Sequence, residues 1–152
     1  MFVQMRLNVT ADELFDVLLN SIHHDIEQAK AKKVPIFKIK TGYTYTKILK
    51  NKIGQKTKAT ATITKLEKPT SYEITFKSGR GVNTVAYELK TLDEDVLEVT
   101  YSENYEAKTS WQAINNTLMS KIFTRPASRK AKALIGMMEA YILQMREQKK
   151  AS

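Results

Sequence analysis

The order of its patterned segments constrains this chain most. Apolar residues recur at every second position over residues 2–9, as in a half-buried β-strand. Helical spacing follows from residue 11 to about 29, about five alternating segments lie between 43 and 105, and helical spacing returns after 110. One antiparallel sheet with its helices grouped on one side buries this pattern most simply. We therefore predict an α+β fold with a curved sheet of about six strands and a long C-terminal helix.

Turn sequences divide the central strands. Between them, the apolar residues alternate with charged residues and threonines, which is typical of strands with one buried face. Short connections of this kind favour an antiparallel meander. The predicted turns lie at 51–54, 68–70, 78–81 and 93–95.

Capping signals mark the starts of the helices. Thr10 and Glu13 form a capping box, so the first helical stretch begins near residue 11; a break near Ser21 would divide it into short helices. Pro35 argues against helix over 30–40. A second capping box lies at 109–112, and Pro126 either kinks the last helix or starts a new one. An apolar stripe is predicted to pack the last helix on the sheet: Ala131, Leu134, Ile135, Met138, Tyr141, Ile142 and Met145.

The length of 152 residues fits a single domain spanning 1–152. The chain has no cysteine, which excludes disulfides, thiolate metal sites and cysteine catalysis and suits a reducing cytoplasm. No secretory leader or membrane-spanning run is evident. We therefore expect a cytoplasmic protein.

The net charge of +9 is unevenly distributed. Residues 30–68 hold twelve basic residues against one acidic residue, and residues 110–152 hold eight against two. A lysine-rich solvated surface is the simplest interpretation, and an anionic partner is the alternative.

Four short strings add a resemblance to the predicted order of elements. They are GYTYTK at 42–47, NKIG at 51–54, GVNTVAY at 81–87 and EVTYSE at 98–103. Together they resemble a family of small uncharacterised bacterial proteins in the helix-grip superfamily of START, SRPBCC, Bet v 1 and polyketide cyclase domains. The resemblance implies a cavity between the sheet and the last helix. It implies no catalytic residues, and six strands instead of the usual seven could shrink or open that cavity.

Polar side chains on the predicted inner face support a cavity hypothesis. Bulky rims with small residues between them leave space, and an apolar pocket with a few polar groups is typical of a ligand site. A packed core with tyrosine hydroxyls at the sheet edge is the alternative. The proposed cavity residues are Tyr45, Ala59, Ala61, Asn83, Tyr87, Tyr101, Glu103 and Met138.

Glu103 is the sharpest candidate among them. A buried carboxylate needs a partner, and Lys47 is available if the strands bring the two together. A carboxyl with a raised pKa could act as a general acid or base beside Tyr87 or Tyr101. A residue at a strand end or a structural ion pair is the simpler explanation of Glu103, because ion-pair networks also produce unusual carboxylates.

Other chemical motifs are weak or absent in the sequence. His23 and His24 are adjacent, so on a helix they diverge by about 100° and do not converge on one metal ion. No glycine-rich phosphate loop and no Gly-x-Ser-x-Gly elbow occurs. We therefore predict neither a metal nor a cofactor. By the resemblance, one of the two histidines could cover the cavity mouth.

Two basic clusters define the rival site. Phosphate-rich partners such as nucleic acid or an anionic membrane would suit them, although no nucleic-acid-binding motif is present. The three hypotheses are thus a binding protein for a small hydrophobic molecule, a cyclase- or hydrolase-type enzyme, and a basic interaction protein; the oligomeric state stays open. The anionic-partner patch comprises Lys50, Lys52, Lys56, Lys58, Arg125, Arg129 and Lys130.

Overall fold

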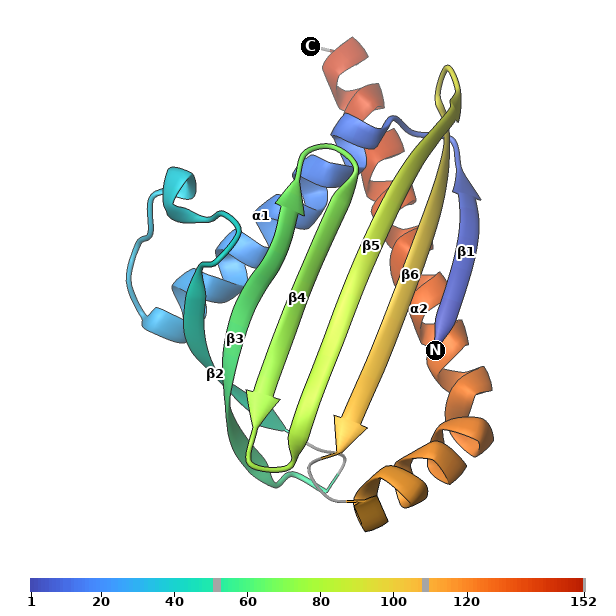
Figure 1. Ribbon diagram of the computed structural model, residues 1–152. Helices are drawn as coiled ribbons and strands as arrows, with labels where there is room; N and C mark the ends of the chain where they lie inside the picture. The colour runs from blue at the N-terminus through green and yellow to red at the C-terminus, as the bar shows by residue number, and fades with distance from the viewer. Residues whose placement is uncertain (51–52, 108–109, 152) are drawn as a thin grey trace.

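A computed structural model describes residues 1–50, 53–107 and 110–151, with residues 110–127 described by their backbone (Figure 1). The predicted order of elements is confirmed. The strands are β1 (Phe2–Leu7), β2 (Thr44–Lys50), β3 (Lys56–Glu67), β4 (Ser71–Ser78), β5 (Gly81–Asp93) and β6 (Val96–Ala107). The helices are α1 (Ala11–Lys30), the short 3-10 helix η1 (Ile36–Lys38) and α2 (Ser110–Ala151).

The six strands form one antiparallel sheet in the order β1-β6-β5-β4-β3-β2. Four consecutive hairpins make the meander from β2 to β6, and β1 adds to the far side of β6. Directly paired residues point to the same face of an antiparallel sheet. The pairs Val3–Tyr101 and Tyr101–Tyr87 therefore continue into Tyr72 as one inward row across four strands.

Helix α1 starts at the predicted capping box. The amide of Glu13 donates to Oγ1 of Thr10 at 3.1 Å, and the amide of Thr10 donates to Oε1 of Glu13 at 2.9 Å. The helix then runs for 20 residues to Lys30 without the break considered near Ser21, and Ala31 caps its C-terminal end with a left-handed backbone and a φ of 53°. One continuous helix and the 3-10 turn after Pro35 thus lie between β1 and β2.

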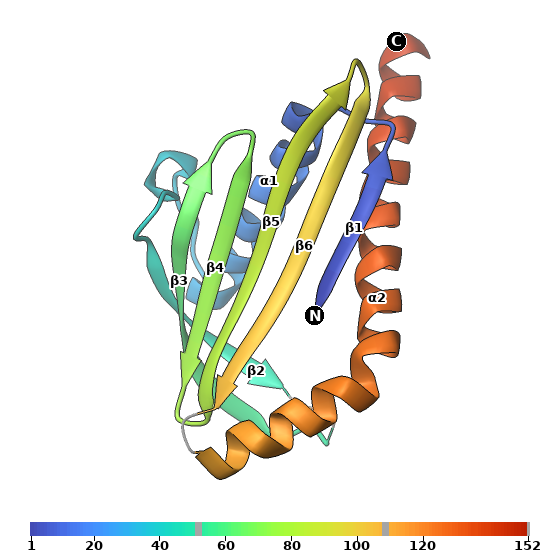
Figure 2. The same cartoon turned by 45° about the vertical axis from the view of Figure 1, so that its right-hand side comes forward.

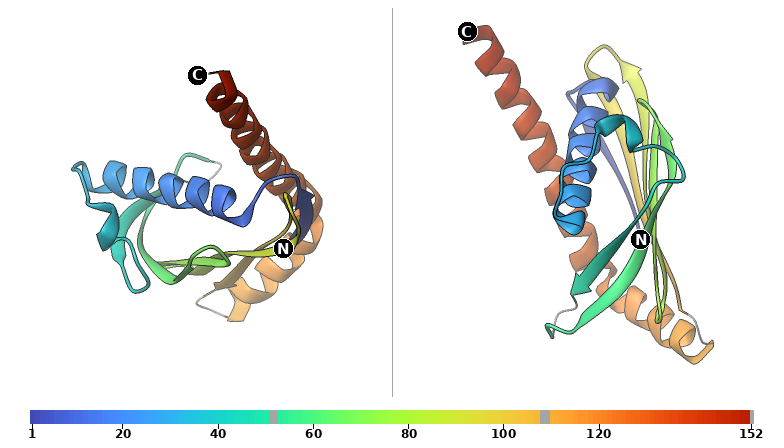
Figure 3. Two further views of the ribbon diagram at one scale, coloured as in Figure 1. Left: turned by 90° about the horizontal axis from the view of Figure 1, so that it is seen from above. Right: turned by 90° about the vertical axis from the view of Figure 1, so that its left-hand side faces the viewer.

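Helices α1 and α2 lie on the same side of the sheet, with axes that diverge (Figure 3). Leu14, Phe15 and Ile26 of α1 are almost fully buried in the core between helix and sheet. Helix α2 contacts β1, β6 and α1, so its described part lies toward the β1 edge of the sheet. The two helices therefore cover different parts of the same face.

The predicted apolar stripe of α2 packs only in part. Ala131, Ile135 and Ile142 are buried, as predicted. Leu134 is 48% exposed and Tyr141 is 53% exposed, so this half of the stripe is not covered by the sheet as expected. The physical reason is that α2 lies toward the β1 edge of the sheet, so that only one side of its apolar stripe reaches the core.

Helix α2 is a single element of 42 residues that runs through Pro126. Because the helix is continuous there, the proline does not start a new helix, and Figure 2 shows the helix axis turning partway along. The second capping box includes residue 109 and lies outside the described residues, as do the side chains of the helical row from 111 to 122. None of the helices in the described residues contains an apolar stretch of the length that a membrane span requires.

Candidate ligand-binding site

A cavity of about 380 Å³ lies between α1, the inner face of the sheet and α2. This volume falls at the lower end of the range of about 300–1,000 Å³ that is usual for small-molecule sites. Exposed side chains such as Ser21 and Leu134 belong to its wall, so the cavity opens to solvent. The described lining residues are Leu18, Ser21, Ile22, His24, Asp25, Lys47, Tyr72, Ile74, Phe76, Val85, Tyr87, Leu134 and Met138.

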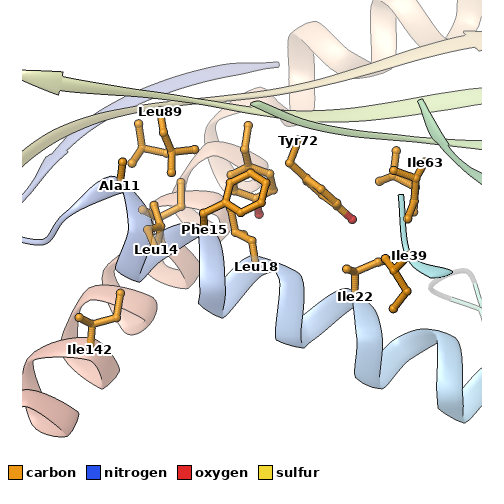
Figure 4. Packing of buried hydrophobic residues seen from close by; sticks show 14 of the residues in the cluster. Ala11, Leu14, Phe15, Leu18, Ile22, Ile39, Ile63, Tyr72, Leu89 and Ile142 are labelled. Carbon is orange, nitrogen blue, oxygen red and sulfur yellow. The ribbon is translucent and has the colours of Figure 1, made fainter. Parts of the chain in front are cut away.

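The helical period of α1 builds one wall. Leu18, Ile22 and Asp25 are spaced by four and three residues, so they share one face of the helix. Figure 4 shows Leu18 and Ile22 pointing toward Tyr72 of β4. A carboxylate therefore continues an apolar helical row into the cavity.

The opposite wall consists of aromatic and aliphatic side chains of β4 and β5. Tyr72 lies directly opposite Tyr87, and their ring centroids are 6.0 Å apart. The Tyr87 ring also meets Tyr101 of β6 edge to face at 5.0 Å. Such tilted aromatic pairs stabilise a core beyond the area they bury. Burial, followed by the charge of Glu103, raises the pKa of Tyr87 to about 12, so this wall is uncharged at neutral pH.

Three polar side chains meet at the β2 side of the cavity. The Lys47 ammonium lies 2.9 Å from Oδ1 and 3.0 Å from Oδ2 of Asp25. The Tyr45 hydroxyl donates to Oδ2 of the same carboxylate at 2.7 Å. Burial, and then the Asp25 carboxylate, raises the pKa of Tyr45 well above its usual value. Tyr45 is thus held neutral as a donor to Asp25.

The expected pairing of Lys47 with Glu103 is wrong. Lys47 is in the edge strand β2, whereas Glu103 is in β6, and three strands lie between them. Lys47 pairs with Asp25 of α1 instead.

Glu103 belongs to a separate polar cluster in β5 and β6. Its Oε2 accepts a hydrogen bond from the Tyr101 hydroxyl at 3.0 Å, and its Oε1 accepts from Nδ2 of Asn83 at 3.2 Å. Burial and the Glu103 charge raise the pKa of Tyr101 above its usual value. Oδ1 of Asn83 is buried without a hydrogen-bond partner. Glu103 is paired directly with Val85, so this cluster borders the cavity wall.

The residues predicted from the sequence to line a cavity are distributed over three places. Tyr87 and Met138 lie in the cavity wall. Tyr45 supports the wall through Asp25, and Ala61 and Ala59 are buried in β3 opposite Tyr45 and Lys47. The remaining three, Asn83, Tyr101 and Glu103, form the neighbouring polar cluster.

Sequence reasoning missed Asp25, Phe76 and most of the α1 wall. The spacing of Leu18, Ile22 and Asp25 carries a usable signal, because it puts a carboxylate on the buried face of an amphipathic helix. For Phe76 and Val85, the alternating pattern predicts only that the side chains face the inner side of the sheet. Which inward residues border space and which are tightly packed depends on where the two helices lie.

The two histidines have separate environments. Nε2 of His23 donates to the carbonyl of Val34 at 2.6 Å, whereas His24 lies in the cavity wall. In the part of the chain that the structure describes, no three acidic or histidine side chains are grouped to hold a metal ion. His24 also borders a second hollow of about 460 Å³ at the end of α1, which is lined mainly by polar side chains: His24, Glu27, Gln28, Ala31, Lys32 and Lys33. That hollow suits a small apolar ligand less well.

The described residues of the predicted basic patch lie on the β2–β3 hairpin and on α2. Lys50, Lys56 and Lys58 are exposed on the β2–β3 hairpin, where Lys50 and Lys56 face each other across the strands. Arg129 and Lys130 are exposed on α2. Lys52 and the Arg125 side chain lie outside the described residues.

These observations define a helix-grip domain with a small cavity on the inner face of its sheet. Solved structures share the fold. Ara h 8.0201 is 11% identical, with a TM-score of 0.59 and coverage of 95% of this chain and 97% of that one. A conserved protein from Geobacillus kaustophilus is 16% identical, with a TM-score of 0.59 and coverage of 94% of both chains. TTHA0849 from Thermus thermophilus is 10% identical, with a TM-score of 0.55 and coverage of 95% of this chain and 97% of that one.

The chain belongs to the family described as "Domain of unknown function (DUF3284)", whose model matches residues 1–124. No curated protein matches the sequence. These three structures are 10–16% identical to the chain, so they establish the fold and leave the ligand to be argued from the cavity itself.

Proposed function

We propose that this protein is a START-like binding protein of the SRPBCC type that holds a small, largely apolar molecule in the cavity between α1, the sheet and α2. One observation carries the proposal. Aromatic and aliphatic side chains from α1, β4, β5 and α2 line a cavity of about 380 Å³, and Asp25 and Lys47 add charged groups at its β2 side. That combination is the usual form of a small-molecule site.

The helices support the same proposal. Leu134 and Met138 are one turn apart on α2 and belong to the cavity wall, yet Leu134 remains 48% exposed. Apolar surface at the opening of a cavity is stabilised when a ligand covers it.

A cytoplasmic location stays a prediction based on the absence of cysteine.

A catalytic function has less support than binding. The Glu103 carboxylate receives hydrogen bonds from both Tyr101 and Asn83, which explains its position as part of a structural network. The helix-grip scaffold hosts carriers and enzymes alike, so the fold does not favour an enzyme.

Two adjacent methionines provide a matched test. Met138 lines the cavity, whereas Met137 is 68% exposed and does not belong to the described lining. The fluorescent probe N-phenyl-1-naphthylamine is titrated into wild type, Met138→Trp and Met137→Trp. We expect wild type and Met137→Trp to bind the probe equally and Met138→Trp to bind at least about tenfold more weakly, because the indole fills the cavity.

Native mass spectrometry of the protein purified from its host complements the titration. A co-purifying apolar species that Met138→Trp lacks is expected. Equal probe binding by both variants would place the probe elsewhere. No probe binding by wild type, together with no co-purifying species, contradicts the proposed function.

A further inference from the structure

An ion pair lies in the described wall of the cavity, which also contains the polar side chains Ser21 and His24. Asp25 and Lys47 both belong to the lining, and their side chains remain 34% and 32% exposed. Around them stand aromatic and aliphatic side chains of the sheet, including Phe76. An ion pair in such surroundings has a desolvation cost that apolar residues of similar volume would avoid. Stability alone therefore does not explain why this ion pair lies in the cavity wall.

Holding α1 to the sheet does not by itself require an ion pair in the cavity. Lys68 and Asp16 form a similar pair between α1 and the β3–β4 turn, with Nζ 2.7 Å from Oδ1, and both lie outside the described cavity wall. Those two side chains are about half exposed, so their pair is largely solvated. Both pairs thus join α1 to the sheet, but only one faces the cavity.

The Asp25 carboxylate and the Phe76 ring fix the position of the Lys47 ammonium. Both oxygens of Asp25 accept from it at 2.9 and 3.0 Å, and Asp25 is itself fixed by the Tyr45 hydroxyl at 2.7 Å. The Nζ atom also lies 5.7 Å from the centre of the Phe76 ring, within reach of a cation–π interaction. Because Phe76 lines the cavity, the ammonium projects over its aromatic wall.

A lysine ammonium has three hydrogens to donate, and Asp25 uses two of them. We infer that the third binds an oxygen acceptor of the ligand, so that the ligand class is an apolar molecule with a carbonyl or carboxylate group at one end. This inference rests on the proposed function. Lys47 orients the polar end, while Tyr72, Ile74 and Val85 contact the apolar body.

Asp25 acts as a positioning residue in this arrangement. It already accepts three hydrogen bonds, from two donors of Lys47 and one of Tyr45, out of roughly four that a carboxylate can accept. A ligand acceptor at Lys47 leaves all three in place. A ligand donor at Asp25 would have to compete with Tyr45 or Lys47, so the acceptor class fits the geometry better.

Three naphthalene probes of similar size test the ligand class. They are 2-acetylnaphthalene with a carbonyl, 2-naphthoate with a carboxylate and 2-isopropylnaphthalene with neither, and their affinities are measured by fluorescence titration. Hydrogen bonds to a charged group predict that at least one oxygen-bearing probe binds wild type about tenfold tighter than 2-isopropylnaphthalene. A preference for naphthoate that weakens with salt identifies a carboxylate, and a salt-independent preference for the ketone identifies a neutral carbonyl.

Variants then assign the preference to Lys47. In Lys47→Met we expect the preference for the oxygen-bearing probe over 2-isopropylnaphthalene to fall to less than about twofold. In the matched control Lys68→Met this preference should equal that of wild type. Because Lys47→Met leaves the Asp25 carboxylate unpaired, the double variant Asp25→Asn with Lys47→Met provides a neutral version of the wall with the same expected loss. The ratio of affinities is the readout, so a general change in stability does not imitate the result.

The failures are distinguishable. If wild type binds all three probes equally, the ligand class is overturned while the proposed binding function stands. A preference that persists in Lys47→Met and in the double variant overturns the role of Lys47. If wild type binds none of the probes and N-phenyl-1-naphthylamine also fails, the inference and the proposed function fall together.

Discussion

Arg146 and Glu13 join the last helix to the first across 133 positions of sequence. Nε of Arg146 donates to Oε2 of Glu13 at 2.7 Å, and a second guanidinium nitrogen donates to Oε1. Glu13 is also the acidic partner of the α1 capping box. One carboxylate therefore both caps the N-terminus of α1 and holds the C-terminal part of α2 against this helix.

This pair predicts a loss of stability in acid. The hydrogen bond from Arg146, followed by the bonds to Thr10, lowers the pKa of Glu13 to about 2. A carboxyl with a depressed pKa stabilises the fold above its ordinary value of 4.5, and this contribution is lost as the pH falls from there toward 2. Since both side chains remain about 30% exposed, solvent screening limits it to about 1 kcal/mol.

The measurement is urea unfolding of wild type and Arg146→Met between about pH 6 and about pH 2.5, a range that starts above the ordinary pKa of Glu13 and covers most of the interval down to the lowered one. The free energy of unfolding should fall less steeply with acidification in the variant, because the Glu13 pKa then lies closer to 4.5. Parallel curves for the two proteins would show that Arg146 does not control this carboxylate.

Alkaline pH probes the aromatic wall of the cavity. Burial, with a smaller effect of the Glu103 charge, raises the pKa of Tyr87 to about 12. The unfolded chain releases this proton near pH 10, so the folded protein should lose stability as the pH rises from 10 to 12, by about 2 kcal/mol for Tyr87. Thermal melts should show a shallower loss in Tyr87→Phe. The exposed Tyr141→Phe serves as control, and a wild-type slope in Tyr87→Phe would count against the burial argument.

The packing of α2 predicts a sharp contrast between two nearby positions. Ile135 is 1% exposed, so Ile135→Ala should destabilise the protein by about 2–5 kcal/mol through lost burial and a cavity. Met137 is 68% exposed, so Met137→Ala should change stability by less than about 0.5 kcal/mol. Chemical denaturation measures both. Similar losses at the two positions would mean that α2 packs through a different face.

The lysines of the β2–β3 hairpin give a prediction about repulsion. Lys50 and Lys56 are directly opposite on adjacent strands, where like charges are destabilising. Lys56→Glu should therefore raise the free energy of unfolding by about 0.5 kcal/mol, and the gain should shrink in high salt. Lys58→Glu is the control, because Lys58 faces Ile48. A destabilised Lys56→Glu would indicate that the two ammonium groups do not meet.

Local patterns determined most of the fold. Period two over β1 and the meander identified the strands and their inner faces, because alternate side chains of a strand must point to opposite sides. The same rule put the Glu103 side chain on the same face of β6 as the Tyr101 side chain, two residues away. The Thr10–Glu13 capping box placed the start of α1, since both of its hydrogen bonds form within one helical turn.

Tertiary structure alone decided the polar contacts of the site and the covered face of α2. Asp25 meets Lys47 and Tyr45 only because α1 crosses the sheet at the β2 edge, and Lys47 is kept from Glu103 by three intervening strands. Half of the α2 stripe is exposed because the helix lies toward the β1 side. A sequence specifies local geometry through short-range sterics and hydrogen bonds. Which distant side chains become neighbours follows from strand order and from the angle at which helices pack, and no local spacing encodes these.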